Sequence, residues 1–459
     1  MRIKLGISMK LKEIALATGG SLNSGRNDII EYITTDSREV QKGDLYVAVK
    51  GERYDGNTFI YDAAQRGGMI MSSETDLSDI YVSDTVKGLL SLSSFYIKRL
   101  ENLKYKIGIT GSVGKTTTKE FLKTILSEMY HVHANKGNLN NCIGMPLSVL
   151  SCPQETEIII MEMGMNHPGE ISRLSKCLCP DIAVITNIGT SHIGYLKSRS
   201  AIAKAKLEIK DGMSDGAVIV PHEEPLLRGV KKFRTYSTKN ASADFYLHHS
   251  KDGTVSIYHN GFLLCSSSFQ FEEEHLVKCL AAAVGAGLCT GINPVCLHDG
   301  ISNISDKNVR QKIISIKNVN FYTDYYNASF ESVIACIEHI RGLRGYSRKS
   351  LILGDILELG EHIEAIHRKI GRLINCRDFY NLFLFGNNAK YIGNEAISRG
   401  FPAEHVFCNC LIESPEITAL QVIKNAIPGE ILLVKASRGM RMEKVMEQIK
   451  LASEENFSE

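Results

Sequence analysis

The sequence of 459 residues has neither a strong excess of one charge nor a long apolar segment. Its 53 basic and 51 acidic residues leave a formal net charge of +2, which does not favour nucleic acid or an anionic membrane as the main partner. No stretch approaches the roughly 18 apolar residues of a membrane-spanning helix. Near the N-terminus, Lys10, Lys12 and Glu13 interrupt the apolar positions before they reach the length of a signal-peptide core. We expect a cytoplasmic protein without a membrane span.

The cysteines lack the spacing of a metal or redox motif. None of the 12 belongs to a Cys-x-x-Cys pair, and only Cys177/Cys179 and Cys408/Cys410 form Cys-x-Cys pairs. The spacing therefore suggests neither a zinc site nor a thioredoxin-like motif. Reduced, mostly buried thiols are the expected state, as in a reducing cytoplasm.

Length and patterning predict three α/β domains, because domains cluster at roughly 100 to 200 residues. Polar, charged stretches place the boundaries so that the domains span residues 1–103, 104–311 and 312–459. In the second and third domains, short apolar runs alternate with helical patterns, as in largely parallel sheets with crossover helices. The predicted strands are 157–163, 181–186 and 217–220 in the central domain and 321–324, 351–354, 382–385 and 431–434 in the last domain.

A glycine-rich loop, Gly108-Ile-Thr-Gly-Ser-Val-Gly-Lys-Thr116, lies between a predicted strand and a helix that opens at Lys115. Glycines let the backbone approach a phosphate chain, and the N–H groups and the helix dipole face the anion. Lys115 can neutralise the β- and γ-phosphates, and Thr116 offers a hydroxyl to magnesium. The strict motif has glycine where Ile109 stands, so the loop is a variant, and a glycine-rich turn without a ligand is the alternative. The loop by itself does not separate a kinase, a GTPase, a transporter ATPase and a ligase.

Two further residues follow predicted strands at the sheet edge where ligands bind in open α/β folds. Glu162 ends the apolar run 158–161, which suits a magnesium carboxylate, although a solvated strand-end acid explains it equally well. His192 follows the next predicted strand, 181–186. A lone histidine is more often structural than a ligand, but a place beside a phosphate and magnesium site favours a metal role. Lys206 by pattern alone is one cation on a solvated helix face.

Taken together and in chain order, the motifs resemble those of the Mur ligases over nearly the whole chain. The motifs of the first domain are Thr35-Asp-Ser-Arg38, Gly43-Asp44 and Gly51-Glu-Arg-Tyr-Asp-Gly56. Those of the central domain are the loop 110–120, Gly137-Asn-Leu-Asn-Asn-Cys-Ile-Gly-Met-Pro146, Glu162-Met-Gly-Met-Asn-His-Pro-Gly-Glu-Ile171 and Thr186-Asn-Ile-Gly189 through His192 to Lys206. Those of the last domain are Tyr326-Asn-Ala328, Leu353-Gly-Asp-Ile-Leu-Glu-Leu-Gly360 and Val434-Lys-Ala-Ser-Arg-Gly-Met-Arg-Met-Glu443.

The resemblance implies a first domain that binds a UDP-sugar, a central ATP-binding domain and a Rossmann-like last domain that brings an amine. In the family's reaction a precursor carboxylate attacks the γ-phosphate of ATP, and the amine then attacks the acyl phosphate to form an amide. The motifs are most similar to those of the branch that joins D-alanyl-D-alanine to UDP-N-acetylmuramoyl-tripeptide in peptidoglycan synthesis. ATP, Mg²⁺ and a monomeric enzyme are therefore expected. The alternatives are a sister ligase that adds a single amino acid and a non-catalytic nucleotide-binding relative.

Matching the family position by position assigns roles to individual residues. Lys206 corresponds to the lysine that the family carbamylates, which turns a cation into a magnesium-facing anion. For catalysis the resemblance implies Lys115, His192, Lys206 and Asn327, and for magnesium it implies Thr116, Glu162, His192 and carbamylated Lys206. The implied ATP-binding residues are Thr110, Gly111, Ser112, Val113, Gly114, Lys115, Thr116, Thr117, Asn141, Arg310 and Asp324. The UDP substrate would contact Ser37, Arg38 and Asn140, and D-alanyl-D-alanine would contact Asn327, Lys435, Ser437 and Arg438.

Several positions depart from the family's pattern. The family's usual Tyr-Asn-Ala-Asn-Pro reads Tyr326-Asn-Ala-Ser-Phe330, and its His-Asn-x-x-Asn reads His275-Leu-Val-Lys-Cys279. Gly194 stands where an acid usually follows the central histidine. None of these changes removes Lys115, Thr116, Glu162, His192 or Lys206, so an active but divergent enzyme is expected.

Overall fold

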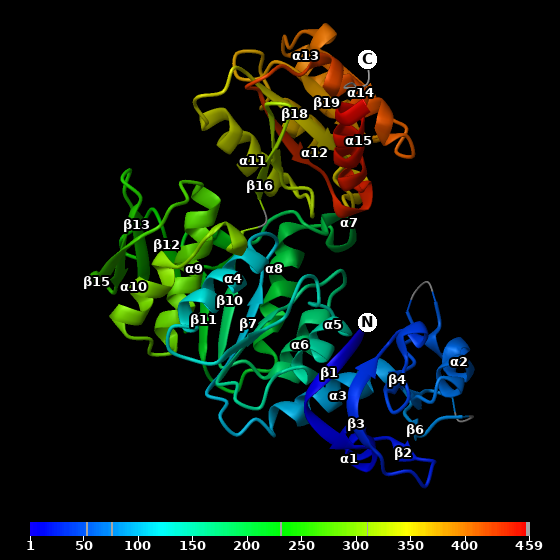
Figure 1. The fold of residues 1–459 in the computed structure, drawn as a ribbon. Helices are drawn as coiled ribbons and strands as arrows, with labels where there is room; N and C mark the ends of the chain where they lie inside the picture. Colours follow the sequence, from blue (N-terminus) through cyan, green and yellow to red (C-terminus); the bar gives the residue numbers. More distant parts are fainter. Residues whose placement is uncertain (52–53, 75–76, 230–231, 310, 456–459) are drawn as a thin grey trace.

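The computed structural model describes residues 1–51, 54–74, 77–229, 232–309 and 311–455. Their strands form three separate sheets that follow one another along the chain (Figure 1). None of the described helices combines the length and apolar character needed to cross a membrane. All 12 cysteines lie in this part of the chain as free thiols.

The first sheet has six strands in the order β1-β3-β4-β5-β6-β2. Strands β3 to β6 are parallel, whereas β1 and β2 run antiparallel at the two edges. The strands are β1 (Arg2–Lys10), β2 (Ser21–Leu22), β3 (Ile29–Thr34), β4 (Leu45–Val47), β5 (Met69–Ser72) and β6 (Ile80–Tyr81), and the helices are α1 (Leu11–Thr18), α2 (Ile60–Gln65) and α3 (Thr85–Ile97), with short 3₁₀ turns η1 (Ser37–Glu39) and η2 (Gly56–Phe59).

The central sheet has nine strands in the order β15-β14-β13-β12-β11-β10-β7-β9-β8, parallel from β8 to β13 and closed by an antiparallel meander. Its middle strands are continuous buried apolar runs, which is expected of strands covered by helices on both faces. The strands are β7 (Tyr105–Thr110), β8 (Val132–Ala134), β9 (Ile158–Glu162), β10 (Ile182–Ile185), β11 (Ala217–Pro221), β12 (Phe233–Ser237), β13 (Phe245–His249), β14 (Thr254–His259) and β15 (Phe262–Ser268). The helical segments are α4 (Lys115–Leu126), α5 (Gly144–Leu150), α6 (Glu170–Leu178), α7 (Ile193–Leu196), α8 (Arg199–Leu207), η3 (Glu208–Lys210), η4 (Pro225–Leu227), α9 (Glu274–Cys289), α10 (Pro294–Ser302) and η5 (Asp306–Asn308).

The third sheet has the order β16-β17-β21-β18-β19-β20, with only β16 antiparallel to its neighbour. The strands are β16 (Lys312–Ile316), β17 (Val319–Thr323), β18 (Lys349–Gly354), β19 (Leu382–Phe385), β20 (Val406–Asn409) and β21 (Ile431–Lys435). The helical segments are α11 (Phe330–Gly342), η6 (Gly360–His362), α12 (Ile363–Gly371), α13 (Lys390–Ser398), η7 (Ala403–His405), α14 (Pro415–Asn425), η8 (Arg438–Met440) and α15 (Met442–Glu455).

The predicted three-part α/β architecture is confirmed, and each predicted strand of the last two domains overlaps an observed one. The predicted domain boundaries at 103/104 and 311/312 both fall between sheets, outside the strands of any of them. They remain predictions, since packing rather than strand order decides what moves as one unit.

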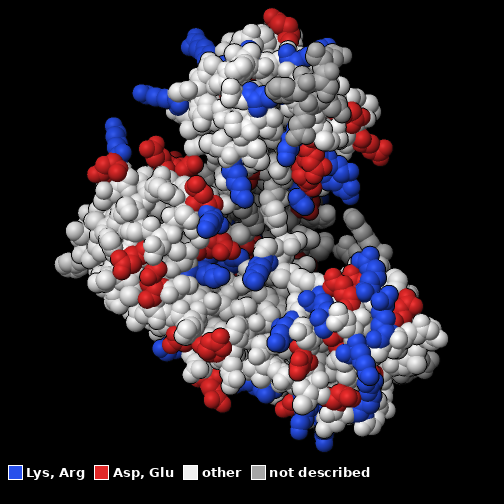
Figure 2. All heavy atoms as spheres, viewed as in Figure 1, with Lys and Arg blue, Asp and Glu red and all other residues white. Residues whose placement is uncertain are grey.

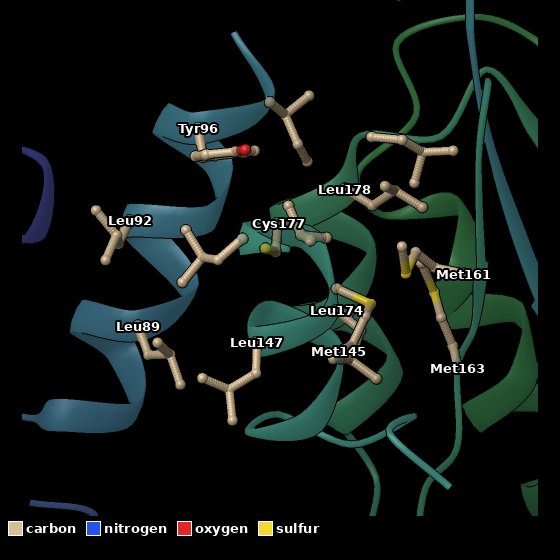
Figure 3. Packing of buried hydrophobic residues seen from close by; sticks show 14 of the residues in the cluster. Leu89, Leu92, Tyr96, Met145, Leu147, Met161, Met163, Leu174, Cys177 and Leu178 are labelled. Atoms are coloured by element: carbon tan, nitrogen blue, oxygen red, sulfur yellow. The ribbon is translucent and has the colours of Figure 1, made fainter. Parts of the chain in front are cut away.

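The first and central domains share one hydrophobic core. Helix α3 begins after Asp84, whose side chain accepts hydrogen bonds from two backbone N–H groups of its first turn. Its buried face, with Leu89, Leu92 and Tyr96, packs against α5 and α6 of the central domain (Figure 3). The Tyr96 hydroxyl donates a 2.6 Å hydrogen bond to the backbone oxygen of Cys152. The two domains are therefore one packed body.

The last domain has its own hydrophobic clusters and meets the central domain at fewer places. One of these places is the contact of the short helix α7 with η6. Figure 1 shows α7 where the upper and lower parts of the molecule approach each other. Figure 2 shows a hollow between these parts, with basic and acidic side chains gathered along its walls. Two cavities between the central and last domains contain many of the predicted site residues.

Truncation of Leu92 to Ala should destabilise the first two domains together. Leu92 is 1% exposed in the shared core, and a buried Leu→Ala change costs about 2–5 kcal/mol of unfolding free energy. We expect calorimetry to show one transition for residues of the first two domains that moves down in temperature, while the transition of the last domain stays. Leu384→Ala, in the core of the last domain, should do the reverse. A separate transition for the first domain in the Leu92 variant would contradict the shared core.

Candidate active site

The glycine-rich loop joins β7 to α4 and has the backbone of a phosphate cradle. Gly114 precedes the first residue of α4 with φ +83°, a conformation that glycine adopts without steric cost. At Gly111 (φ +153°), an added Cβ would lie 1.8 Å from the hydroxyl oxygen of Thr186. The N-terminus of α4 and the side chain of Lys115 thus face the same point, and Lys115 Nζ donates to the Gly111 carbonyl at 2.9 Å.

The loop is held by the segment that follows β10. Asn187 accepts from the backbone N–H groups of Ser112 and Val113 through its Oδ1, both at 2.9 Å, while the Thr186 hydroxyl donates to the Val113 carbonyl at 2.6 Å. These contacts fix the backbone of the loop, so Asn187 helps to shape the phosphate cradle. Asn187 was part of a motif in the sequence, but its amide oxygen had no assigned role. Only the folded contact, 74 residues apart in the chain, reveals it.

Thr116 and Glu162 meet beside the loop. The Thr116 hydroxyl donates to Glu162 Oε2 at 2.5 Å, and the Asn140 amide donates to Oε1 at 2.8 Å. A buried carboxylate and a hydroxyl are hard oxygen ligands, and Mg²⁺ typically takes one or two carboxylates together with water and substrate phosphates. Among the described residues no three His, Cys, Asp or Glu side chains gather into a metal cluster. The residues present fit a magnesium ion that bridges protein and phosphate.

Lys206 lies inside the protein rather than on a solvated helix face. The residue is 2% exposed, and burial together with the charge of Lys115 holds the pKa of its amine well below the ordinary value. Burial therefore favours the neutral form of this amine, near the phosphate loop. A neutral amine is the form that can react with carbon dioxide to give a carbamate.

A cavity of about 490 Å³ joins the phosphate loop to the last domain. Its lining includes residues 112–117, Glu162, Thr186 and Asn187 from the central domain and Asp324, Asn327, Glu331 and Lys435 from the last domain. Burial alone would raise the pKa of Asp324, but the 2.7 Å ion pair with Lys435 lowers it below its usual value. Lys435 also donates to the Asn327 carbonyl at 3.1 Å, so this cation shapes the segment that carries Asn327.

A second, smaller cavity of about 90 Å³ lies on the other side of Asn327 and Ser329. It contains His192 from the central domain and Glu358, Ser437 and Arg438 from the last domain. His192 Nδ1 lies 2.6 Å from Glu358 Oε2, and this close contact lowers the pKa of the Glu358 carboxyl. Three of the four residues predicted to meet the dipeptide thus line one cavity, and Lys435 lines the larger one.

Comparison with known proteins places this geometry in a family. Family models match in chain order: the Mur ligase family catalytic domain at residues 29–87, the Mur ligase middle domain at 109–287 and the Mur ligase glutamate ligase domain at 309–438. The UDP-N-acetylmuramoyl-tripeptide–D-alanyl-D-alanine ligase of Bacillus subtilis is 35% identical over 96% of this chain and 98% of its own length.

The chain belongs to the Mur ligase family. Among solved Mur ligases, the crystal structure of MurF from Acinetobacter baumannii superposes with a TM-score of 0.86 at 26% identity, covering 98% of this chain and all of the other. MurF ligase from Thermotoga maritima, solved in complex with ADP, superposes with a TM-score of 0.78 at 26% identity, covering 92% of this chain and 98% of the other. The predicted resemblance is confirmed.

Some residues matched to the Mur ligase pattern lie outside both cavities. Thr110 is buried and donates to the Met163 carbonyl at 2.9 Å, below the loop. Asn141 is exposed and caps the start of α5 by accepting from the N–H groups of residues 143 and 144. Ser37 and Arg38 lie in the first domain, where Arg38 pairs with Asp36. Their substrate roles stay predictions, and Arg310 lies outside the described residues.

The departures from the Mur ligase pattern have local explanations. Ser329 caps the start of α11, where its hydroxyl accepts from a backbone N–H at 3.3 Å. Leu276 is buried in the core. Cys279 packs on the phosphate loop, and its Sγ lies 3.7 Å from the Gly114 carbonyl. Burial lowers the pKa of His275 to about 4, and within the described part of the chain its Nε2 has no hydrogen-bond partner. His275 therefore offers a buried polar atom to the larger cavity.

Replacement of Gly111 by Ala should weaken nucleotide binding while the fold remains. The new Cβ would overlap the Thr186 hydroxyl and displace the loop, so we expect roughly a 100-fold loss of affinity for an ATP analogue in calorimetric titration. Gly342→Ala is the matched control, because no atom lies within 4 Å of its added Cβ. Unchanged affinity in Gly111→Ala would mean that the loop does not bind the phosphates.

Proposed function

We propose that this chain is an ATP-dependent ligase that joins D-alanyl-D-alanine to UDP-N-acetylmuramoyl-tripeptide, giving the pentapeptide precursor of peptidoglycan. The observation that carries the proposal is the pair of adjoining cavities. One runs from the phosphate loop to Asp324 and Asn327, and the other continues from Asn327 to Ser437 and Arg438. A nucleotide and an amine could thus reach one reaction centre from two sides. The Bacillus subtilis relative that is 35% identical is named for this reaction.

The chemistry solves a problem of charge and leaving group. A carboxylate is a poor electrophile, so its oxygen first attacks the γ-phosphorus of ATP, which breaks the bond to ADP and forms an acyl phosphate. The amine of the dipeptide then attacks the acyl carbon. The carbon–oxygen bond to phosphate breaks, inorganic phosphate leaves, and the amine loses its protons as the amide forms. Positioned cations are required because two anions must approach in the first step.

The described residues divide this task among themselves. Lys115 and the backbone N–H groups at the start of α4 would bind the phosphate chain, while Asn187 holds the loop that precedes them. Thr116 and Glu162 would hold Mg²⁺, with Asn140 orienting the carboxylate. When bound, this ion would neutralise phosphate charge. His192 and a carbamylated Lys206 would serve a second ion.

The first domain would bring the UDP precursor. Ser37 and Arg38 lie on its η1 turn, and the shared core holds that domain firmly against the central one. The enzyme is further proposed to be monomeric and to keep its twelve free thiols in a reducing compartment.

Phosphate release by the purified protein tests the function directly. The assay contains ATP, Mg²⁺, UDP-N-acetylmuramoyl-tripeptide and either D-alanyl-D-alanine or a single amino acid, and the product mass is recorded. We expect release and a mass gain equal to the dipeptide, both lost in Lys115→Ala. Turnover with a single amino acid alone would indicate a sister ligase, and no turnover with any amine would indicate a non-catalytic relative.

Carbamylation of Lys206 is expected to appear in carbon-13 spectra of the protein in labelled bicarbonate. Burial favours the neutral form of this amine, which can attack carbon dioxide, and the resulting anion would be stabilised by magnesium and Lys115. One carbamate signal should be present in the wild type and absent in Lys206→Arg. Lys204 is exposed and lies two residues before Lys206 on the same helix, so Lys204→Arg is the control and should keep the signal. A spectrum without a carbamate signal in the wild type would refute the modification.

A further inference from the structure

The smaller cavity is lined by an acidic residue, Glu358, that has not yet been assigned a role. Glu358 lies in the loop between β18 and η6, with its side chain 41% exposed and directed to His192. Its backbone has φ +63°, a left-handed conformation that is strained for a non-glycine residue. Such strain persists only where neighbouring contacts hold the backbone in place.

The contacts that hold Glu358 come from the central domain. The Gly194 N–H donates to the Glu358 carbonyl at 3.0 Å. A Cβ on Gly194 would lie 2.6 Å from that carbonyl and 2.5 Å from the backbone nitrogen of Gly360. The glycine at position 194 is therefore what allows the two domains to approach closely enough for Glu358 to reach His192.

The opposite charge of the cavity is supplied by a neighbouring loop. The backbone N–H of Leu357 donates to the Ser437 hydroxyl at 2.9 Å, which ties the two loops together. Glu358 follows Leu357 in the chain and Arg438 follows Ser437, and both residues line the cavity. The cavity thus offers a carboxylate and a guanidinium, the kinds of partner that the ammonium and the carboxylate of a small zwitterion need, and Arg438 also lies 3.5 Å from Glu443.

We infer that Glu358 binds the ammonium group of the incoming dipeptide, while Arg438 binds its carboxylate. This inference rests on the proposed function, since it names the group that recognises the second substrate. His192, through its contact with Glu358, orients the carboxylate and links the amine site to the central domain. The amine is thus held beside Asn327, where the two cavities adjoin. An uncharged, acylated amine would lack the ionic contact.

The test compares a charged ligand with an uncharged one in Glu358→Gln. The Michaelis constant for D-alanyl-D-alanine and the inhibition constant of N-acetyl-D-alanyl-D-alanine are measured with the full chain, ATP, Mg²⁺ and the UDP-tripeptide. In the wild type, the acetylated peptide should bind on the order of 10- to 100-fold more weakly than the dipeptide. In Glu358→Gln, the dipeptide should weaken by that factor, the acetylated peptide should not, and the Michaelis constants for ATP and the UDP-tripeptide should stay within about twofold.

Two further variants separate recognition from folding. Glu361→Gln removes an exposed acid three residues along the same loop and should leave all constants unchanged. Gly194→Ala displaces the 358–360 backbone and should weaken the dipeptide selectively, while an ATP analogue still binds with wild-type affinity in titration. Equal weakening of the dipeptide and its acetylated form in Glu358→Gln would overturn the inference, as would a changed magnesium dependence with unchanged dipeptide binding.

The outcome is distinguishable from failure of the proposed function. If the wild type forms product only with a single amino acid, the dipeptide assignment fails. The same comparison, made with that amino acid and its N-acetyl derivative, then still decides whether Glu358 binds the ammonium group. An unchanged ratio between those two ligands in Glu358→Gln would reject the role of Glu358 for any amine.

Discussion

The approach of the phosphate loop to the segment after β10 is the contact on which the rest of the site depends. Because Gly111 has no side chain, Thr186 can lie against the loop and Asn187 can bind its N–H groups. The same segment continues to Thr190, whose hydroxyl donates to Glu331 of the last domain at 3.2 Å. It then reaches His192 and its partner Glu358. One stretch of nine residues, 186–194, therefore connects the nucleotide cradle with the domain that is proposed to bring the amine.

Positive charge is concentrated near the larger cavity. Lys115, Lys206 and Lys435 are gathered around the larger cavity or beneath it, and two of them are almost fully buried. A buried ammonium is costly unless it is paired or neutral. Lys435 is paired with Asp324, whereas burial and the charge of Lys115 lower the pKa of the Lys206 amine and so favour its neutral form. The protein thus prepares positive charge for a polyphosphate and keeps one amine available for modification.

The sequence predicted the parts of the site whose signal is local. The phosphate loop has glycines at the positions of special backbone geometry, and the strand 382–385 is a run of four buried apolar residues that the structure reproduces. Lys206 shows the limit of the pattern itself: it resembled a solvated cation, and only the family resemblance, and now its burial, indicated otherwise. The partnerships of Asn187 with the loop and of Glu358 with His192 were not predictable, because they join residues 74 and 166 positions apart without any periodic signal. Asn140 was assigned to the UDP substrate, yet its amide contacts Glu162, and its substrate role stays a prediction.

The central claim is that a precursor carboxylate is activated as an acyl phosphate between the two cavities. Oxygen-18 in the terminal carboxylate of UDP-N-acetylmuramoyl-tripeptide tests this claim most directly, with the mass of the released phosphate as the measurement. If the carboxylate oxygen attacks the γ-phosphorus and the amine then displaces phosphate, the phosphate must carry one labelled oxygen for every amide formed. Unlabelled phosphate accompanying amide formation would contradict the account.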